Sequence, residues 1–304
     1  MGFYGAGLLI APGVGPLVGG MAIDAFDWRF IFLMPLPFCM VALIGGGIFM
    51  PGREARRRLP PLDWLGYLLL ACTLFLLMTG AANGSRWGWT STRVLLHGVG
   101  GGLCGFGFVL WQLKSRAPLL DFGLWRNRRF TAALSIAFVF GGGVFGISYV
   151  IPVFVQEVQG YTATQAGAVM LPAGVMLVLI MPLTGRFADR VSYHIPIIMG
   201  LVCFAIGAGA MSVADVNTPF WTFALLCCVS QLGLAFLMPS LSVSALSALE
   251  PHQLFRGSGN VNFIRQLGGA VGTNLIVVWI QMRTVFHSDV LTATQTADNQ
   301  TTRE

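Results

Sequence analysis

Long apolar runs separated by short polar turns dominate the pattern along this chain. About 20 apolar residues in a helix cross roughly 30 Å of hydrocarbon, and nine runs here come close to that length. The last run is the most polar, because Asn262, Arg265, Gln266 and Asn274 lie in it or at its start. The pattern predicts nine transmembrane helices, at about Phe3–Ile23, Phe30–Met50, Trp64–Ala82, Val94–Leu113, Phe130–Val155, Ala166–Leu183, Ile195–Ala214, Phe220–Leu241 and Val261–Ile280.

The composition supports this interpretation. Of the 304 residues, 55% are hydrophobic and 10% are charged, against about 25% charged in a typical soluble domain. The mean hydropathy is +0.74. Such a chain cannot cover a water-facing surface, and it is too apolar to be disordered. We therefore predict an all-α integral membrane protein with about nine transmembrane helices.

The basic residues indicate an orientation. Thirteen of the 18 Lys and Arg residues fall in one set of alternate loops, and such loops face the cytoplasm. This distribution also explains the net charge of +6 without a nucleic-acid partner. It predicts a cytoplasmic amino terminus and an extracytoplasmic carboxyl tail. The polar part of the tail, from His287 to Glu304, is expected to be disordered.

The sequence offers no enzymatic or metal chemistry. The six cysteines all lie in apolar runs without a Cys-x-x-Cys spacing, so we interpret them as packing residues. We find no phosphate-binding loop with a lysine, no zinc-spaced histidine pair and no nucleophile elbow. We expect no catalytic residue, no cofactor and no metal site.

Small residues in the first run form a face of their own. Ala11, Gly15 and Gly19 lie four residues apart, so they share one side of a helix, and Pro16 and Gly20 adjoin them. Without side chains, that face allows a second helix to approach backbone to backbone. Two interpretations remain open: a static tight contact, or a pliable contact between two moving bundles.

A basic turn follows the sixth run. In it Asp189 stands between Arg186 and Arg190, after Gly185. A carboxylate between two guanidinium groups can form charge-assisted hydrogen bonds and can hold two helix ends together in one state only. The turn is therefore a candidate cytoplasmic gate. The alternative is an ordinary basic loop on the cytoplasmic side.

Polar and aromatic residues in the later runs suggest a binding cavity. Phe145, Tyr149, Gln231 and Asn262 are the candidates, and the glycine-rich stretch 141–146 is expected to loosen the fifth run. Aromatic rings and amides suit bulky apolar cations. The alternatives are lipid or core packing for the rings and an interhelical hydrogen bond for Gln231.

Acidic residues are missing from the middle of every predicted span. Glu157 comes closest, just past the end of the fifth. We place Asp24, Asp27 and Asp215 in loops, and Asp63 at the entry of a helix. A proton-coupled transporter needs a titratable group that faces alternate sides of the membrane. Proton coupling by this polypeptide alone is therefore in question.

Several motifs resemble one family. Gly2, Ala11, Gly15-Pro16 and Gly19-Gly20 resemble the antiporter motif of the major facilitator superfamily, in which a glycine stands where this chain has Ala11. The chain is also similar to the fourteen-span drug:proton antiporter branch, and Gly185–Arg190 resembles a cytoplasmic gate motif of the superfamily. The further matching stretches are Asp27–Leu33, Leu62–Gly66, Leu120–Phe122, Arg126–Phe130, Gly160–Tyr161, Gln165–Gly167, Leu171–Gly174 and Asn262–Ala270.

The resemblance implies a partial major-facilitator fold and a division of the chain. Residues 1–50 would be the last two spans of an amino-terminal bundle, and 51–63 a cytoplasmic linker. Residues 64–129 would be an inserted helix pair with a cytoplasmic loop, 130–282 five spans of a carboxyl-terminal bundle, and 283–304 the tail. The first four spans and the last span of the family fold, with the best-known coupling acids, would be missing.

Two hypotheses about function follow. In the first, the chain is part of a proton-coupled multidrug efflux transporter of the bacterial plasma (inner) membrane that works by alternating access. Its partners would be small amphipathic or cationic compounds, protons and lipid. In the second, the chain is a non-transporting membrane fragment, or a subunit that needs a complementary fragment. We expect no drug efflux from cells that express this chain alone.

Overall fold

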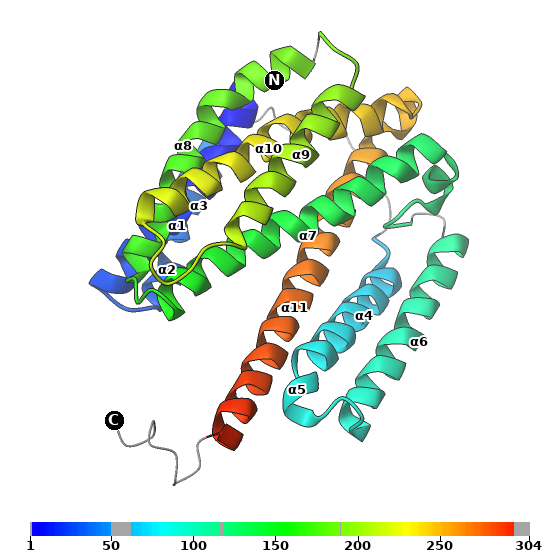
Figure 1. Cartoon of the computed structure of the whole chain (residues 1–304). Helices are drawn as coiled ribbons and strands as arrows, with labels where there is room; N and C mark the ends of the chain where they lie inside the picture. Colours follow the sequence, from blue (N-terminus) through cyan, green and yellow to red (C-terminus); the bar gives the residue numbers. More distant parts are fainter. Residues whose placement is uncertain (1, 50–61, 116–117, 189, 295–304) are drawn as a thin grey trace. The chain divides into compact units, whose positions relative to one another are not determined.

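The computed structural model describes residues 2–49, 62–115, 118–188 and 190–294, of which 2–12 and 291–294 are described by their backbone alone. These residues form helices joined by short turns, and no strand occurs among them (Figure 1). The helices are α1 (Gly2–Ala25), α2 (Phe30–Leu33), α3 (Pro35–Phe49), α4 (Trp64–Ala82), α5 (Gly84–Trp87), α6 (Thr92–Lys114), η1 (Phe122–Arg126), α7 (Arg128–Glu157), α8 (Ala163–Ala188), α9 (His194–Met211), α10 (Phe220–Ser247), η2 (Pro251–Gln253) and α11 (Leu254–Thr294).

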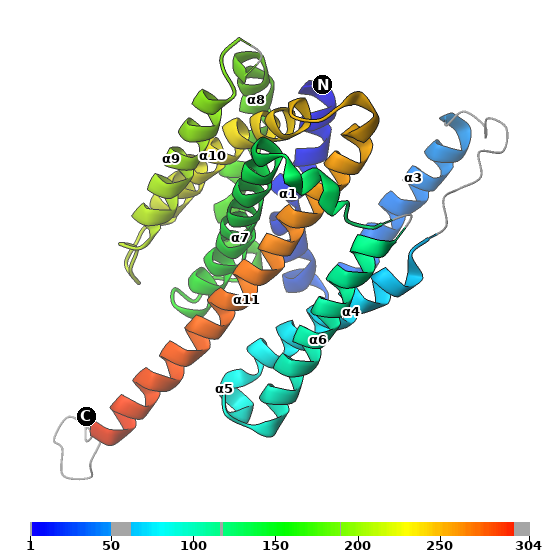
Figure 2. The ribbon, with the colours of Figure 1, turned by 90° about the vertical axis from the view of Figure 1, so that its right-hand side faces the viewer.

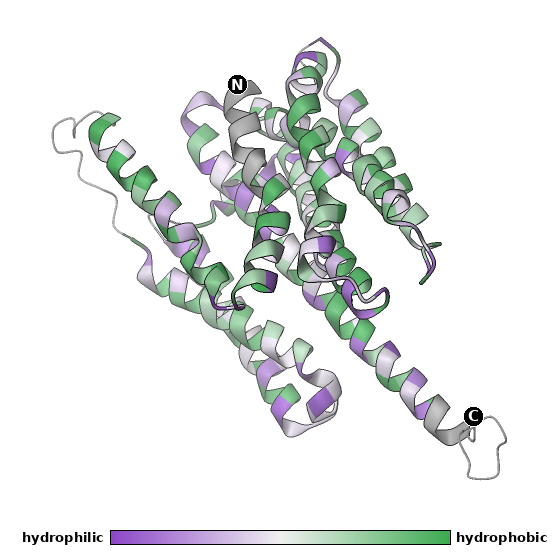
Figure 3. Ribbon diagram, turned by 90° about the vertical axis from the view of Figure 1, so that its left-hand side faces the viewer, coloured by the Kyte–Doolittle hydropathy of each residue, from purple (hydrophilic) through white to green (hydrophobic). Residues whose placement is uncertain are grey.

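The transmembrane prediction is confirmed for eight of the nine runs. In the described residues, eight helical stretches are long and apolar enough to cross a membrane. The first run is also helical, as α1, but half of its side chains lie outside the described residues. Figure 3 shows hydrophobic residues along the helices and hydrophilic ones at their ends and connections. The chain is a multi-pass membrane protein.

Two expectations about helix ends were wrong. The carboxyl tail was expected to be disordered from His287, yet α11 continues through that residue to Thr294. Residues 295–304 lie outside the described part. Asp24 was placed in a loop, but it lies in the last turn of α1. In both cases a helix runs past the apolar stretch, because polar residues at a membrane surface can continue a helix into water.

Local sequence signals explain where several helices begin and end. Asp63 caps α4 by accepting a hydrogen bond from the Gly66 N–H at 2.9 Å, and Ser91 caps α6 through the Val94 N–H at 3.3 Å. Gly88 and Gly160 have φ values of +84° and +69°, which favour glycine, and both lie in turns. These turns separate α5 from α6 and α7 from α8.

The helices group into two compact units. Unit 1 comprises residues 1–59 and 147–250, and its core joins the end of α7 to α8 and α10. Val155, Val169 and Phe223 are buried there. Helix α10 packs on both α8 and α9, and α1 packs along α8. These packed helices hold the predicted antiporter motif and, at the end of α8, Gly185 and Arg186 of the predicted gate motif.

Unit 2 comprises residues 60–146 and 251–304. Helices α4 and α6 lie side by side as a hairpin through α5 (Figure 2), and α11 packs on α4. Asn274 of α11 donates a hydrogen bond to the Met78 carbonyl of α4 at 3.3 Å. In a membrane such an amide contact between helices is favourable because no water competes for it. The polar residue that weakened the last predicted span therefore connects two helices.

Glycines bring α7 and α11 together within unit 2. A Cβ atom at Gly141 would overlap the Arg265 carbonyl oxygen, and one at Gly268 would overlap the Phe138 carbonyl oxygen. Residues 141–146 were expected to loosen the helix. Instead, α7 is continuous from Arg128 to Glu157, and Gly141 and Gly142 allow close packing. The loosening expectation was therefore wrong.

Candidate functional site

The first candidate region is the contact between α1 and α8, which we call the glycine seam. It consists of Gly13, Pro16, Leu17 and Gly20 on α1, and of Ala163, Gly167 and Gly174 on α8. A Cβ atom at Gly167 would overlap the Pro16 carbonyl oxygen, and one at Gly20 would overlap the Ala163 carbonyl oxygen. Gly13, Gly20, Gly167 and Gly174 are all buried. Two backbones therefore touch with almost no side chain between them.

The seam does not follow the expected face of α1. That face comprised Ala11, Gly15 and Gly19, but Cβ atoms at Gly15 and Gly19 would meet nothing within 4 Å among the described residues. The side chain of Ala11 lies outside the described part. Small residues do allow α1 to lie close to a second helix, as the pattern suggested, but the residues that do so are Gly13 and Gly20. Pro16 and Gly20 of the predicted motif take part, whereas Gly15 and Gly19 face away.

At one end of the seam, an acidic side chain joins the two helices. The Asp24 Oδ2 atom accepts a hydrogen bond from the Thr164 backbone N–H at 2.8 Å. The start of α8 also carries its own capping box: Gln165 N–H donates to Thr162 Oγ1 at 3.3 Å, and Thr162 N–H donates to Gln165 Oε1 at 3.1 Å. Asp24 thus satisfies a helix-terminal donor from a neighbouring helix.

The predicted gate motif lies at the other end of α8. Gly185 and Arg186 fall in its last turns, and the Arg190 N–H donates to the Phe187 carbonyl at 3.0 Å. Both arginine side chains are exposed. Arg186 has a favourable position, because the carboxyl end of a helix attracts a positive charge. Asp189 lies outside the described residues, so its pairing with the arginines stays a prediction.

The four cavity candidates divide between the units. Phe145 and Asn262 belong to unit 2, whereas Tyr149 and Gln231 belong to unit 1. Phe145 packs where a Cβ atom at Gly269 would lie, and Asn262 accepts a hydrogen bond from Arg265 at 3.0 Å. The side chains of Phe145 and Tyr149 are 47% and 39% exposed. A shared cavity stays a prediction.

A second region, in unit 2, is a polar network around Gln112. This side chain is 3% exposed. Its Nε2 atom donates to Asp63 Oδ2 at 2.8 Å, and its Oε1 atom accepts from the Leu120 N–H at 3.3 Å. Trp111 Nε1 donates to Asp63 Oδ1 at 2.7 Å. The amide therefore connects the start of α4, the end of α6 and the loop that follows.

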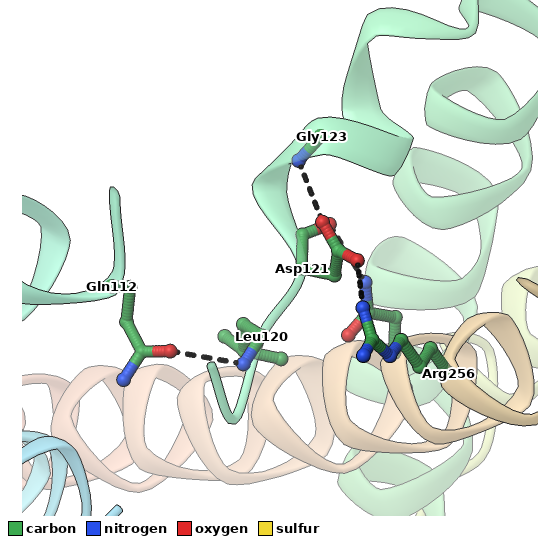
Figure 4. A network of polar contacts seen from close by, with 6 residues as sticks. Gln112, Leu120, Asp121, Gly123 and Arg256 are labelled. Carbon is green, nitrogen blue, oxygen red and sulfur yellow. Dashed lines mark hydrogen bonds and ion pairs between the residues drawn. The ribbon is translucent and has the colours of Figure 1, made fainter. Parts of the chain in front are cut away.

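The network continues to α11 through Asp121 (Figure 4). The Asp121 carboxylate accepts a hydrogen bond from the Gly123 N–H at 3.0 Å and pairs with Arg256 at 3.2 Å. The buried Asn260 donates to the Asp121 carbonyl at 3.3 Å. We call the set Asp63, Gln112, Leu120, Asp121, Arg256 and Asn260 the polar network. It fixes the first turns of α11 against the loop before α7.

The charge state of Asp63 follows from this geometry. Burial opposes ionisation of its carboxyl group, but the hydrogen bonds from the Gly66 N–H, Trp111 and Gln112 outweigh burial and lower its pKa below 3.8. The group is therefore ionised at neutral pH. Gly66 is needed here, because a Cβ atom at that position would overlap the amide of Gln112.

Metal binding finds no support in the part of the chain that the structure describes, where no group of three His, Cys, Asp or Glu side chains comes together. The six cysteines are free thiols.

Sequence reasoning missed Asp24, Gln112 and Asn260 as contact residues. Only Asp24 carried a usable signal, since it follows Gly20 by one helical turn.

Comparison with known proteins identifies the family. The chain matches the family described as Major Facilitator Superfamily over residues 1–273. The Multidrug export protein EmrB of Escherichia coli (strain K12) is 28% identical over 93% of this chain and 56% of its own length. The Lincomycin resistance protein LmrB of Listeria monocytogenes is 28% identical over 91% of this chain and 59% of its own length.

A third relative, the Uncharacterized MFS-type transporter YhcA of Bacillus subtilis (strain 168), is 26% identical over 98% of this chain and 56% of its own length. The chain therefore spans somewhat more than half the length of these relatives. The family match covers most of the chain, and the relatives include named multidrug exporters. The chain belongs to the major facilitator superfamily, and the predicted resemblance to its drug:proton antiporter-type branch is confirmed.

Proposed function

We propose that the chain forms part of a secondary active transporter that exports small amphipathic or cationic compounds in exchange for protons. The observation that carries this proposal is the glycine seam, since the stretch that resembles the antiporter motif supplies its α1 side. A contact without intervening side chains lets two helices slide or tilt against each other at little steric cost. Alternating access requires such movement.

The other parts have roles consistent with this proposal. Residues 1–50 and 130–282 would supply spans of two bundles, 51–63 the cytoplasmic linker and 64–129 the inserted helix pair. The basic loops would face the cytoplasm of a bacterial inner membrane, with the amino terminus inside and residues 283–304 outside. Arg186, Asp189 and Arg190 would form the cytoplasmic gate. Phe145, Tyr149, Gln231 and Asn262 would line the substrate cavity.

A transport assay tests the proposal. The chain is expressed alone, and also together with the portion of Escherichia coli EmrB that its match leaves uncovered. Ethidium export from energised cells is measured with and without a protonophore. We expect export only from the combined protein, and its loss with the protonophore and in R186A/R190A. Arg256→Ala serves as the matched control, because Arg256 is an exposed arginine outside the proposed gate.

In its first form, a non-transporting fragment, the second hypothesis makes a different forecast for the same cells. A non-transporting fragment gives no ethidium export in either form, although both forms reach the membrane. A partner-dependent subunit gives export only with the complement, as the proposed transporter does, so this assay separates the proposal from the non-transporting fragment alone. Export that survives the protonophore would overturn proton coupling. Export by the chain alone would overturn the expectation that the uncovered portion is required.

A further inference from the structure

The contact between Asp24 and α8 has a feature that an ordinary helix cap lacks. A cap normally comes from the residue just before its own helix. Here Thr162 and Gln165 already cap α8 from within, yet the Thr164 N–H is taken by Asp24, 140 residues earlier in the chain. The hydrogen bond can form only while the ends of α1 and α8 lie together.

The small size of Gly20 and the charge of Asp24 both act at the amino terminus of α8. Gly20 precedes Asp24 by one turn of α1, and a Cβ atom there would overlap the Ala163 carbonyl oxygen. Because Gly20 has no side chain, the last turn of α1 lies close enough for the carboxylate to reach the first turn of α8. The amino terminus of a helix attracts a negative charge, and α8 is 26 residues long. The Asp24–Thr164 bond is therefore charge-assisted.

We propose that Asp24 is a positioning residue for alternating access: it holds the ends of α1 and α8 together on the face opposite the basic loops, and the bond breaks when that face opens. This inference rests on the proposed function for its role in transport. The contact itself does not depend on that role. Removing the carboxylate shifts the equilibrium toward separated helix ends.

The distance between the two helix ends can be measured directly. Spin labels are placed on cysteines at Phe26, just after α1, and at Val158, in the turn that leads from α7 into α8. Both residues are exposed, and the full chain is used with its six native cysteines replaced. Double electron–electron resonance is recorded in lipid nanodiscs. We expect one dominant short distance in the parent. Asp24→Ala should raise the ratio of long to short distances about tenfold, the effect of losing one charge-assisted hydrogen bond.

Three variants test whether Asp24 holds the two helix ends together or serves merely as a cap of α8. Asp27→Asn removes a nearby exposed charge and should leave the distances unchanged. Gln165→Ala weakens the internal capping box of α8 but keeps the Asp24 bond, so it should also leave them unchanged. Asp24→Asn keeps an acceptor without the charge and should fall between the parent and Asp24→Ala.

Two results would overturn the inference: unchanged distances in Asp24→Ala, or an equal shift in Gln165→Ala, which would reduce Asp24 to a helix cap. The ethidium assay in the combined protein is read separately. If Asp24→Ala shifts the distances while no form of the protein exports dye, the contact stands and the proposed transport function fails. If dye is exported, Asp24→Ala should lower its rate and Asp27→Asn should not.

Discussion

The glycine seam and the polar network hold helices together by different means. In the seam, α1 meets α8 through backbone atoms, and the hydrogen bond from the Thr164 N–H to Asp24 lies at one end. In the network, α4, α6 and α11 are joined by side chains that reach across loops. The first region depends on volume, and the second on donors, acceptors and charge.

Because of this difference, the two regions should be destabilised by different kinds of substitution. A close backbone contact fails when a single methyl group is added, but neither salt nor pH acts on it. A polar network accepts changes of volume at its exposed edges, but it loses stability when a buried donor or acceptor has no partner. The seam therefore suits a surface along which helices move, and the network suits a joint that stays fixed.

The largest effect should come from a methyl group in the seam. Gly167→Ala would force its Cβ against the Pro16 carbonyl and the Leu17 backbone, so we expect a loss of about 1–3 kcal/mol. Gly19→Ala is the matched control. Its Cβ meets nothing within 4 Å among the described residues, and alanine favours a helix, so stability should stay equal or rise. Thermal unfolding of both variants in detergent measures the difference. Equal unfolding temperatures would show that the backbones are not in close contact.

The next effect concerns the centre of the network. Gln112→Ala removes an acceptor from the buried Leu120 N–H and a donor from Asp63. We expect a loss of about 1–3 kcal/mol, the usual cost of leaving a buried polar group unpaired. Gln156→Ala is the control, because that exposed amide donates within its own helix, to the Pro152 carbonyl. Similar losses in the two variants would show that the network does not stabilise unit 2.

A smaller effect should depend on pH. The pKa of Asp63 is lower in the folded chain than its ordinary value of 3.8, so its contribution is complete above pH 3.8 and is lost as the pH falls through the folded pKa. Asp63→Asn should cost about 1 kcal/mol at pH 7, because an amide can still cap α4 but its nitrogen cannot accept, so it cannot serve both Trp111 and Gln112. The difference between parent and variant should shrink below pH 4. Thermal unfolding between pH 3 and 7 measures it, and a difference that stays constant with pH would contradict the assignment.

The helices could be predicted from the sequence to a greater extent than the contacts. Long apolar runs identify α4 to its exact ends, because about 20 apolar residues have few alternatives to a membrane helix. The small residues of α1 predicted a close helix contact, but not which face it would use. That choice depends on α8, whose Gly167 and Gly174 lie far away in the chain.

The polar contacts were hidden by sequence distance. Gln112 bonds to Asp63, 49 residues earlier, and Asp24 to Thr164, 140 residues later. A glutamine at the end of an apolar helix looks like any residue at the membrane surface until its partners are known. Asp24 was assigned to a loop because the apolar pattern stops before the helix does. Periodicity reports burial of apolar faces, and it contains no information about which polar ends meet.

The smallest effect should come from the edge of the network. Arg256 is 61% exposed in its side chain, and its 3.2 Å contact with Asp121 is open to water and salt. An exposed ion pair contributes about 0.2–1 kcal/mol, so Arg256→Ala should lower stability far less than Gln112→Ala. Added sodium chloride at about 1 M should remove most of the difference from the parent, because the screening length falls to about 3 Å. The stability of Arg256→Lys should lie close to that of the parent.

Asp121→Ala should lower stability more than Arg256→Ala does at any salt concentration, since it also removes the acceptor for the Gly123 N–H at the start of η1. If Arg256→Ala were as harmful as Gln112→Ala, the fixed joint of unit 2 would depend on its exposed charges rather than on its buried amide.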